Sequence, residues 1–366
     1  MQRDLTFTGG QVLGAQCLAP ADLSVRDGRF ENGPAGPDGR AVDVSGLWLL
    51  PGIVDLHGDG FERHLAPRRG VMTDLAKGLE SVEAELATCG ITTAWLALFW
   101  SWEGSMRGPD FATRFAQALT GSRAARRLDL RMQLRLESHM VEDGDAVRAL
   151  IATHGIDYLV INDHLPHARL AEGRTPPRLT GSALKAGRSP EAHLAEMQYR
   201  AAQGPKVAGF VEALARDRAP RGVRLGTHDD PDAETRARHA AQGLDICEFP
   251  TTRAAAAAAH AAGAPVIMGA PPVLRGGNGG AQIIRHKHAR AGPRGQQAGV
   301  LQMANRLAQR RARHAQPFGQ ITFGRQARAG AQHAAQDQLF DLADHGGGKL
   351  FRLNGAKWHG APALNW

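Results

Sequence analysis

Two side chains that commonly bind metal ions lie one residue apart at the end of an apolar run. His57 and Asp59 close the segment Leu-Leu-Pro-Gly-Ile-Val-Asp-Leu-His-Gly-Asp, residues 49–59. In an extended strand, residues i and i+2 point to the same side, so these side chains project together from the strand end. An imidazole and a carboxylate are both good ligands for a divalent cation, and a strand end holds them rigidly. The pair therefore predicts metal-dependent chemistry.

Three more potential ligands end short hydrophobic runs. Glu137 follows Leu-Arg-Leu, His164 follows Leu-Val-Ile-Asn-Asp, and His228 follows Val-Arg-Leu-Gly-Thr. A single histidine in such a place is more often a buried core residue than a ligand, so the prediction depends on the recurrence. The predicted metal ligands are His57, Asp59, Glu137, His164 and His228, with Glu137 as the bridging carboxylate.

This ligand set predicts a centre for two divalent metal ions. Two cations about 3.5–4 Å apart can share a hydroxide, which makes a nucleophile available near neutral pH. Mixed imidazole and carboxylate ligation suits zinc, iron and manganese alike, so the ligand types do not select the metal.

Basic side chains near the predicted centre suit an anionic substrate. Arg63, His64 and Arg68 follow the first ligand pair directly, and Arg275 follows a late strand-like run. A guanidinium group can donate two parallel hydrogen bonds to a phosphate group, so we predict that these four residues bind substrate. The alternative is that they are solvated surface residues.

The elements that would position these residues alternate between strand-like and helix-like segments. From residue 51 to about 277, apolar runs at 90–100, 128–136, 158–161, 223–226, 246–249 and 266–269 are separated by segments with helical spacing. This alternation favours an α/β fold with a parallel sheet closed into a (β/α)₈ barrel, in which functional residues lie at the carboxyl ends of strands. Residues 1–50 are predicted to form short β segments, and 51–277 the barrel.

Residues 278–366 differ in composition from the rest of the chain. They hold 13 Lys and Arg against 3 Asp and no Glu, a net +10, whereas the preceding residues hold 31 against 33, a net −2. The basic character therefore belongs to this tail, which has eleven of the 19 glutamines and few apolar runs. Such a composition buries little surface, so we expect a disordered or non-homologous tail, such as the product of a shifted reading frame.

The overall composition indicates a cytoplasmic protein. With 366 residues, the chain can bury a large core, and no run approaches the roughly 20 apolar residues of a membrane helix. Its three cysteines are far apart in sequence, which disfavours a disulfide framework. The expected partner is an anionic small molecule, without a membrane or nucleic acid, and a homo-oligomer is compatible with the sequence.

The motifs together resemble a known family. The segment at 49–59 resembles the first-strand motif of the amidohydrolase superfamily, in the variant that replaces the second histidine by aspartate. With Thr-His-Asp-Asp at 227–230, Glu-Phe-Pro-Thr-Thr at 248–252 and Met-Gly-Ala-Pro-Pro-Val-Leu-Arg-Gly-Gly at 268–277, it resembles the phosphonate-metabolism branch, the diphosphatases of the carbon–phosphorus lyase pathway. The likeness covers residues 1 to about 277.

This resemblance implies a metal-dependent release of diphosphate from a small phosphorylated sugar, α-D-ribose 1-methylphosphonate 5-triphosphate. It also implies that residues 1–50 belong to a small β-sandwich completed by the C-terminus. The chain departs from the family after residue 277, because no Ser-Asp-Tyr strand follows to supply the last metal-binding aspartate. A barrel without its last strand would expose two sheet edges, so we expect a tendency to aggregate. The alternatives are an amidohydrolase acting on an amide or N-acyl sugar, and a catalytically impaired barrel whose basic tail binds nucleic acid or an acidic partner.

Overall fold

The computed structural model describes residues 4–14, 17–26, 28–32, 39–68, 71–269 and 349–351. The chain divides into two compact units. The first holds the described residues up to Ile53, the segment Leu86–Thr92 and the short strand at 349–351. The second holds Val54–Glu85 and the described residues from Thr93 onward to Gly269. Arg275 and nearly all of the 278–366 tail lie outside the described residues.

The first unit contains two four-stranded sheets, of order β5-β4-β1-β6 and β15-β7-β2-β3. Their strands are β1 (Leu5–Thr8), β2 (Gln11–Leu13), β3 (Leu18–Pro20), β4 (Leu23–Arg26), β5 (Arg29–Asn32), β6 (Arg40–Asp43), β7 (Leu47–Leu49) and β15 (Lys349–Phe351). Phe7, Val25, Val44 and Leu49 form the buried core. The sequence pattern does not predict β15, which pairs in parallel with β7.

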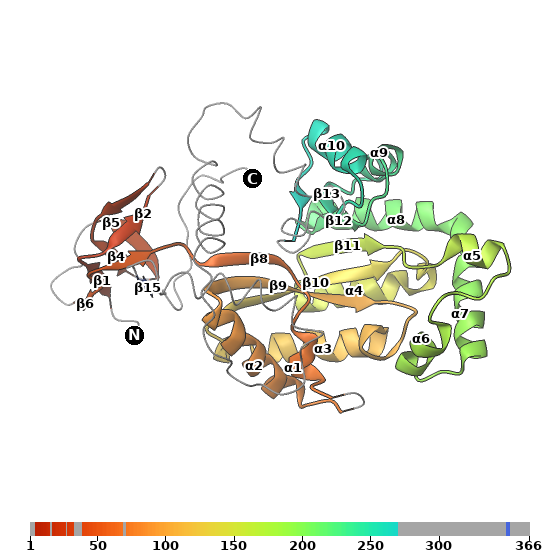
Figure 1. Cartoon of the computed structure of the whole chain (residues 1–366), viewed down its shortest axis with the longest axis horizontal. Helices are drawn as coiled ribbons and strands as arrows, with labels where there is room; N and C mark the ends of the chain where they lie inside the picture. Colours follow the sequence, from red (N-terminus) through yellow and green to blue (C-terminus); the bar gives the residue numbers. More distant parts are fainter. Residues whose placement is uncertain are drawn as a thin grey trace, which may run out of the picture. The chain divides into compact units, whose positions relative to one another are not determined.

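The second unit is built around a seven-stranded sheet of order β14-β13-β12-β11-β10-β9-β8 (Figure 1). Its strands are β8 (Ile53–Gly58), β9 (Ile91–Trp100), β10 (Asp129–Glu137), β11 (Tyr158–Asn162), β12 (Arg224–His228), β13 (Ile246–Glu248) and β14 (Val266–Ile267). Neighbouring strands from β9 to β14 are parallel. Strand order follows chain order, as in a (β/α) barrel.

The sheet curls until strands far apart in its order touch. In a flat sheet, five strand spacings would separate β8 from β13 by roughly 24 Å. Instead, His57 Nδ1 on β8 lies 2.9 Å from Glu248 Oε2 on β13. Gln133 on β10 donates both to Leu56 O, at 3.3 Å, and to Glu248 Oε1, at 2.7 Å. The described residues thus form seven strands of a nearly closed barrel, which confirms the expected fold class.

The two faces of β10 show how the sequence directs side chains in this barrel. Leu134 and Leu136 are fully buried, and β10 packs against α3 (Pro109–Gly121) outside the sheet. The alternate residues Gln133, Arg135 and Glu137 are also buried, but they point to the other face, where Glu248 lies. Because side chains alternate along a strand, one apolar-polar sequence builds a helix-facing core and a polar interior.

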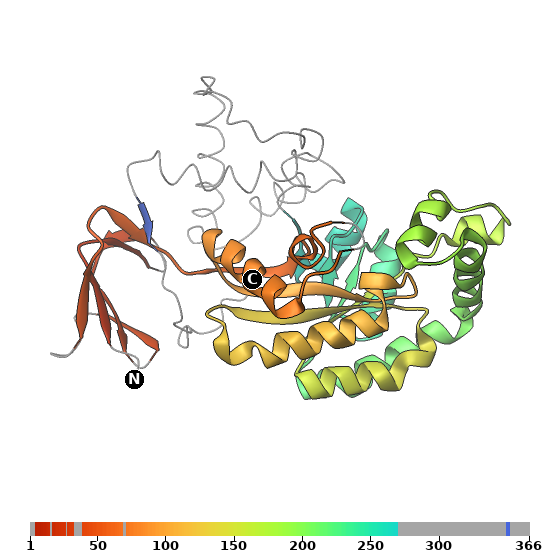
Figure 2. The same cartoon turned by 90° about the horizontal axis from the view of Figure 1, so that it is seen from below.

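Helices lie along the sheet and beyond one end of its strands (Figures 1 and 2). Besides α3, they are α1 (Glu62–Leu65), α2 (Leu75–Thr88), α4 (Gly144–His154), α5 (His167–Ala171), α6 (Leu179–Ala186), α7 (Pro190–Ala202), α8 (Gly204–Arg218), α9 (Ala233–Ala241) and α10 (Arg253–Ala261). The side-chain oxygens of Ser189, Asp232 and Thr252 cap α7, α9 and α10. Each accepts a hydrogen bond from the backbone N–H three residues further along the chain, at 3.1, 2.7 and 3.2 Å.

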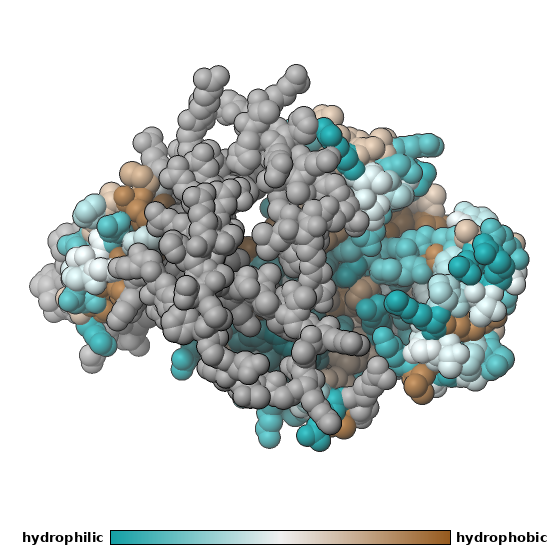
Figure 3. All heavy atoms as spheres, in the orientation of Figure 1, coloured by the Kyte–Doolittle hydropathy of each residue, from teal (hydrophilic) through white to brown (hydrophobic). Residues whose placement is uncertain are grey.

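The predicted strands and long helices of the barrel are confirmed, whereas the short helices α1, α5 and α6 were not expected. On the face seen in Figure 3, residues of α5 to α7 are mainly hydrophilic, with scattered apolar groups. None of the described helices is long and apolar enough to cross a membrane.

Candidate metal centre

Three side chains from three strands converge at the carboxyl end of the sheet. His57, His228 and Glu248 each offer a ligand atom, and these atoms lie within 4.8 Å of one another. The rings of His57 and His228 have centroids 5.2 Å apart. All three residues end their strands or lie one residue before the end, where barrel strands place functional groups. The sequence predicted the two histidines as ligands, and the structure brings them together.

Glu248 is completely buried and held by polar partners. Its Oε1 accepts hydrogen bonds from Gln133 Nε2, at 2.7 Å, and from the Tyr158 hydroxyl, at 2.5 Å. Burial, together with the Glu248 charge, raises the pKa of Tyr158, so its hydroxyl stays protonated as a donor. Because Oε1 already accepts two hydrogen bonds, the oxygen available to a cation is Oε2, which faces His57.

The backbone turns sharply directly after two of these ligands. Asp229, which follows His228, has φ 62°, and Phe249, which follows Glu248, has φ 47°. Non-glycine residues rarely adopt this left-handed region, and such strain costs about 1–3 kcal/mol where it occurs. The Phe249 ring packs on both histidines, with centroids 4.9 Å from His57 and 5.2 Å from His228. The strained turn thus places an apolar wall against the ligand rings.

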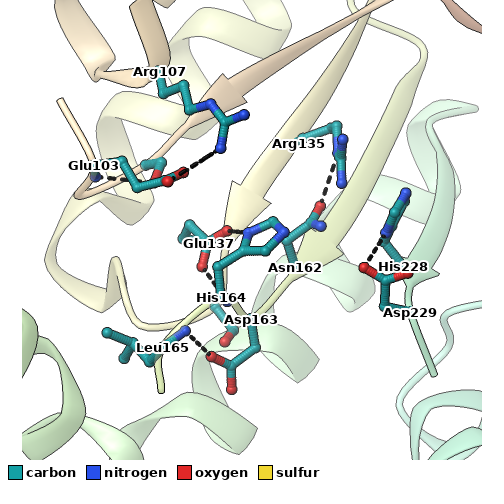
Figure 4. A network of polar contacts seen from close by, with 12 residues as sticks. Glu103, Arg107, Arg135, Glu137, Asn162, Asp163, His164, Leu165, His228 and Asp229 are labelled. Atoms are coloured by element: carbon teal, nitrogen blue, oxygen red, sulfur yellow. Dashed lines mark hydrogen bonds and ion pairs between the residues drawn. The ribbon is translucent and has the colours of Figure 1, made fainter. Parts of the chain in front are cut away.

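Glu137 and His164 form a second pair in the same interior (Figure 4). Glu137 is completely buried, its Oε1 contacts His164 Nδ1, and its Oε2 accepts from the His164 backbone N–H at 3.0 Å. Burial alone would lower the pKa of His164, but the hydrogen bond and charge of Glu137 outweigh it, and the pKa is raised. Because Nδ1 is used, Nε2 is the ring atom left to hold a proton or a metal ion. The bridging role of Glu137 stays a prediction.

Asp229 links the two groups electrostatically. Its carboxylate lies 2.9 Å from His228 Nδ1 and also interacts with the charge of His164. Its pKa is lowered, because these contacts outweigh the opposing effect of burial. An ionised Asp229 therefore interacts electrostatically with the imidazoles of both groups, although the ligand prediction did not include it.

Arg135 places a buried cation beside this centre. Its side chain lies on the same face of β10 as Glu137, donates from Nε to Asn162 Oδ1 at 3.2 Å, and stacks 4.3 Å from the Phe99 ring centroid. Arg107 stacks on the same ring at 4.4 Å, and pairs with Glu103 at 2.9 Å. Burial lowers the pKa of Arg135 from a value so high that the group remains charged near neutral pH.

The other predicted site residues do not join this cluster. Asp59 is exposed and belongs to neither group of potential ligands found among the described residues. Arg63 and His64 both contact Glu85 of α2, and Arg68 is exposed in an isolated bridge with Val71. Arg275 lies outside the described residues. Their predicted roles in metal or substrate binding remain predictions.

The donor set at His57, His228 and Glu248 fits a divalent metal ion. Two imidazoles and a carboxylate form the protein ligand set of an open zinc site. Burial lowers the pKa of His228, which favours the neutral imidazole that a metal requires. Asp229, 2.9 Å from His228 Nδ1, orients this ring, as the carboxylate partner of a metal-binding histidine commonly does.

Sequence reasoning did not include Glu248 among the ligands. The signal was present, because Glu248 ends a strand-like run in the same way as Glu137. Its pattern was noted only as part of a family motif. What the sequence could not supply was the curvature that carries β13 across to β8.

Comparison with known proteins supplies a relative of named activity. The chain is 28% identical over 262 residues to α-D-ribose 1-methylphosphonate 5-triphosphate diphosphatase of Escherichia coli (strain K12), a match covering 69% of this chain and 68% of that protein. It is also 38% identical over 56 residues to a D-hydantoinase of Rhizobium radiobacter, covering 15% and 12%. Both matches support the resemblance to the amidohydrolase superfamily. No family model matches it.

Solved structures similar to this chain are more distant. A protein described as uncharacterized is 16% identical with a TM-score of 0.48, covering 76% of this chain and 69% of the other. A prolidase complexed with N-methylphosphonate-L-proline is 18% identical with a TM-score of 0.41, with the same coverage. A D-hydantoinase is 15% identical with a TM-score of 0.32, covering 67% and 57%.

Proposed function

We propose that this chain is a metal-dependent hydrolase that releases diphosphate from α-D-ribose 1-methylphosphonate 5-triphosphate. The relatives support a hydrolase of the amidohydrolase superfamily. The observation that carries the proposal is the convergence of His57, His228 and Glu248 in an interior that also holds the buried Arg135. A site that combines potential metal ligands with a buried guanidinium suits a highly charged phosphate substrate.

The metal ligands would be His57, His228 and Glu248, whereas His164 and Glu137 in the same interior would manage a proton. A divalent cation bound there would supply Lewis-acid polarisation of a phosphoryl oxygen and of water. Zinc, iron and manganese all suit this donor set.

Arginine side chains of the chain itself would orient the triphosphate. Arg135 uses Nε to bind Asn162, which leaves its two terminal nitrogens to donate in a fork to phosphate oxygens. The Phe99 ring holds the guanidinium plane of Arg135 on one side and also contacts Arg107. These fixed cations would stabilise charge that accumulates on the phosphoryl oxygens during transfer.

Glu137 would control the proton on His164. The carboxylate contacts both the ring Nδ1 and the backbone N–H, which fixes the ring orientation and favours the protonated imidazole. In that form Nε2 can donate to the departing diphosphate.

The test is an assay of the purified, metal-loaded full chain with the ribosyl triphosphate and, separately, with N-acyl sugars. We expect diphosphate release, and we expect Arg135→Lys to raise KM at least tenfold because lysine lacks the bidentate fork. Arg114→Lys is the matched control, since Arg114 also stacks on an aromatic ring, at 5.8 Å from Phe111, but is exposed. Deacylation of N-acyl sugars without diphosphate release would contradict the proposal and favour the amidase alternative.

A further inference from the structure

A second cluster of potential metal ligands lies apart from His57, His228 and Glu248. We propose that His139, Asp163 and His167 form a separate binding site for a divalent transition-metal ion. Each offers a ligand atom, and these three atoms lie within 4.8 Å of one another. None of the three belongs to the predicted ligand set, and the proposal goes beyond the hydrolase function.

The three residues come from the loops that follow two neighbouring strands. His139 lies two residues after the end of β10, Asp163 directly follows β11, and His167 is the first residue of α5. Because β10 and β11 are parallel and adjacent, their carboxyl ends bring these loops together. The cluster is therefore a product of the barrel topology and not of sequence proximity alone.

The carboxylate lies between two imidazoles. Asp163 Oδ2 is 2.7 Å from His167 Nε2, and Asp163 Oδ1 is 3.8 Å from His139 Nδ1. The two rings have centroids 5.0 Å apart. Ligand atoms bound to one zinc ion at 2.0–2.2 Å in tetrahedral geometry are about 3.3 Å from each other. The observed separations bracket this spacing, so small side-chain rotations would bring all three atoms onto one ion.

The cluster combines a fixed ligand with adjustable ones. His139 is 5% exposed, so packing fixes its ring, and its Nδ1 also lies 3.0 Å from Ser138 Oγ. Asp163 Oδ1 accepts from the Leu165 backbone N–H at 3.1 Å, whereas the side chains of Asp163 and His167 are 41% and 48% exposed. The exposed side would admit a metal ion and leave coordination positions for water. Two imidazoles and one carboxylate form the protein ligand set of open zinc sites, and they also suit manganese and iron.

The experiment is a titration of the chelator-treated full chain with Zn²⁺ by calorimetry, repeated with Co²⁺ and monitored by visible absorption. We expect His167→Ala to lose one equivalent of bound metal and the matching part of the Co²⁺ spectrum. His260→Ala, which removes an exposed histidine from α10, should retain both. Because His167 is half-exposed, its variant should melt at the wild-type temperature, which circular dichroism would check.

A second variant separates this site from the proposed hydrolase centre. The double substitution His57→Ala with His228→Ala should still bind one equivalent, and adding His167→Ala should abolish it. Unchanged stoichiometry in His167→Ala would overturn the proposal and leave a hydrogen-bonded His-Asp-His triad. A failed diphosphate assay with intact metal binding at His167 would count against the proposed function alone.

Discussion

At the residue scale, Glu248 contributes most to the arrangement of the candidate metal centre. A fully buried carboxylate is costly unless charge or hydrogen bonds compensate it. Here Gln133 and Tyr158 satisfy one oxygen and His57 contacts the other. That arrangement holds the second oxygen toward the two imidazoles, so the carboxylate is oriented before any cation binds.

Replacing this carboxylate by its neutral isostere tests that role. Glu248→Gln keeps the side-chain volume but removes the negative charge beside His57 and His228. We expect metal affinity at this centre to fall at least tenfold, since loss of even an outer partner of a metal ligand costs roughly 10–100-fold. Equilibrium dialysis with metal analysis measures the change.

The control for this substitution is Glu80→Gln, which removes an exposed carboxylate from α2. It should bind metal as the wild type does. Equal affinities in Glu248→Gln and wild-type protein would show that Glu248 is a structural hydrogen-bond acceptor only.

At the element scale, α7 packs a histidine against the segment that follows β9. His193 is 1% exposed, its ring centroid lies 5.6 Å from that of Trp102, and neither ring nitrogen has a hydrogen-bond partner among the described residues. Burial lowers the pKa of His193, and the nearby Arg188 adds to this effect. The helix therefore packs best when this imidazole is neutral.

The lowered pKa of His193 predicts an acid-sensitive contribution to stability. Below about pH 6.5 this histidine becomes protonated in the unfolded chain but stays neutral in the folded chain. The free energy of unfolding therefore falls as the pH falls through that value. Above it the contribution is fully present. We expect the melting temperature of His193→Leu to decrease less between pH 8 and pH 5 than that of the wild type, as measured by calorimetry.

The exposed His260 of α10 provides the comparison for this pH series. His260→Leu should show the wild-type pH dependence. If His193→Leu and wild-type protein lost stability in parallel on acidification, the buried histidine would not be the group responsible.

At the scale of the whole molecule, the described part of the barrel ends in outer strands. β8 lies at one end of the seven-stranded sheet, and Ile53, Val54 and Leu56 on it are 55%, 54% and 40% exposed. An apolar outer strand offers unpaired backbone and side chains to another chain, which promotes association. We therefore expect the tendency to aggregate to arise at β8 (Figure 1).

A charge on this strand should reduce association. We expect Val54→Lys to slow aggregation several-fold in light scattering at a fixed protein concentration, because lysine on an outer strand opposes edge-to-edge pairing. Leu184→Lys changes an equally apolar but helical residue, 74% exposed on α6, and should have little effect. Equal effects of the two substitutions would point to net charge and not to the strand edge.

The sequence alone determined the local elements and the types of residue at their ends. The apolar run at 128–136 predicted β10 to within a residue, because such a pattern is a local property of the chain. By the same reasoning His57, Asp59, Glu137, His164 and His228 were predicted as ligands at strand ends. The short helices and β15 were missed, because their stability comes from packing and pairing rather than from their own pattern.

Only the tertiary structure decided which of these side chains meet. Curvature of the sheet carries β13 across to β8, so His57 contacts Glu248, while Glu137 contacts His164 instead. It also leaves Asp59 exposed and gathers His139, Asp163 and His167 outside the predicted ligand set. The reason is physical: a strand's pattern determines which face a residue occupies, but the register and closure of the whole sheet determine what that face encounters.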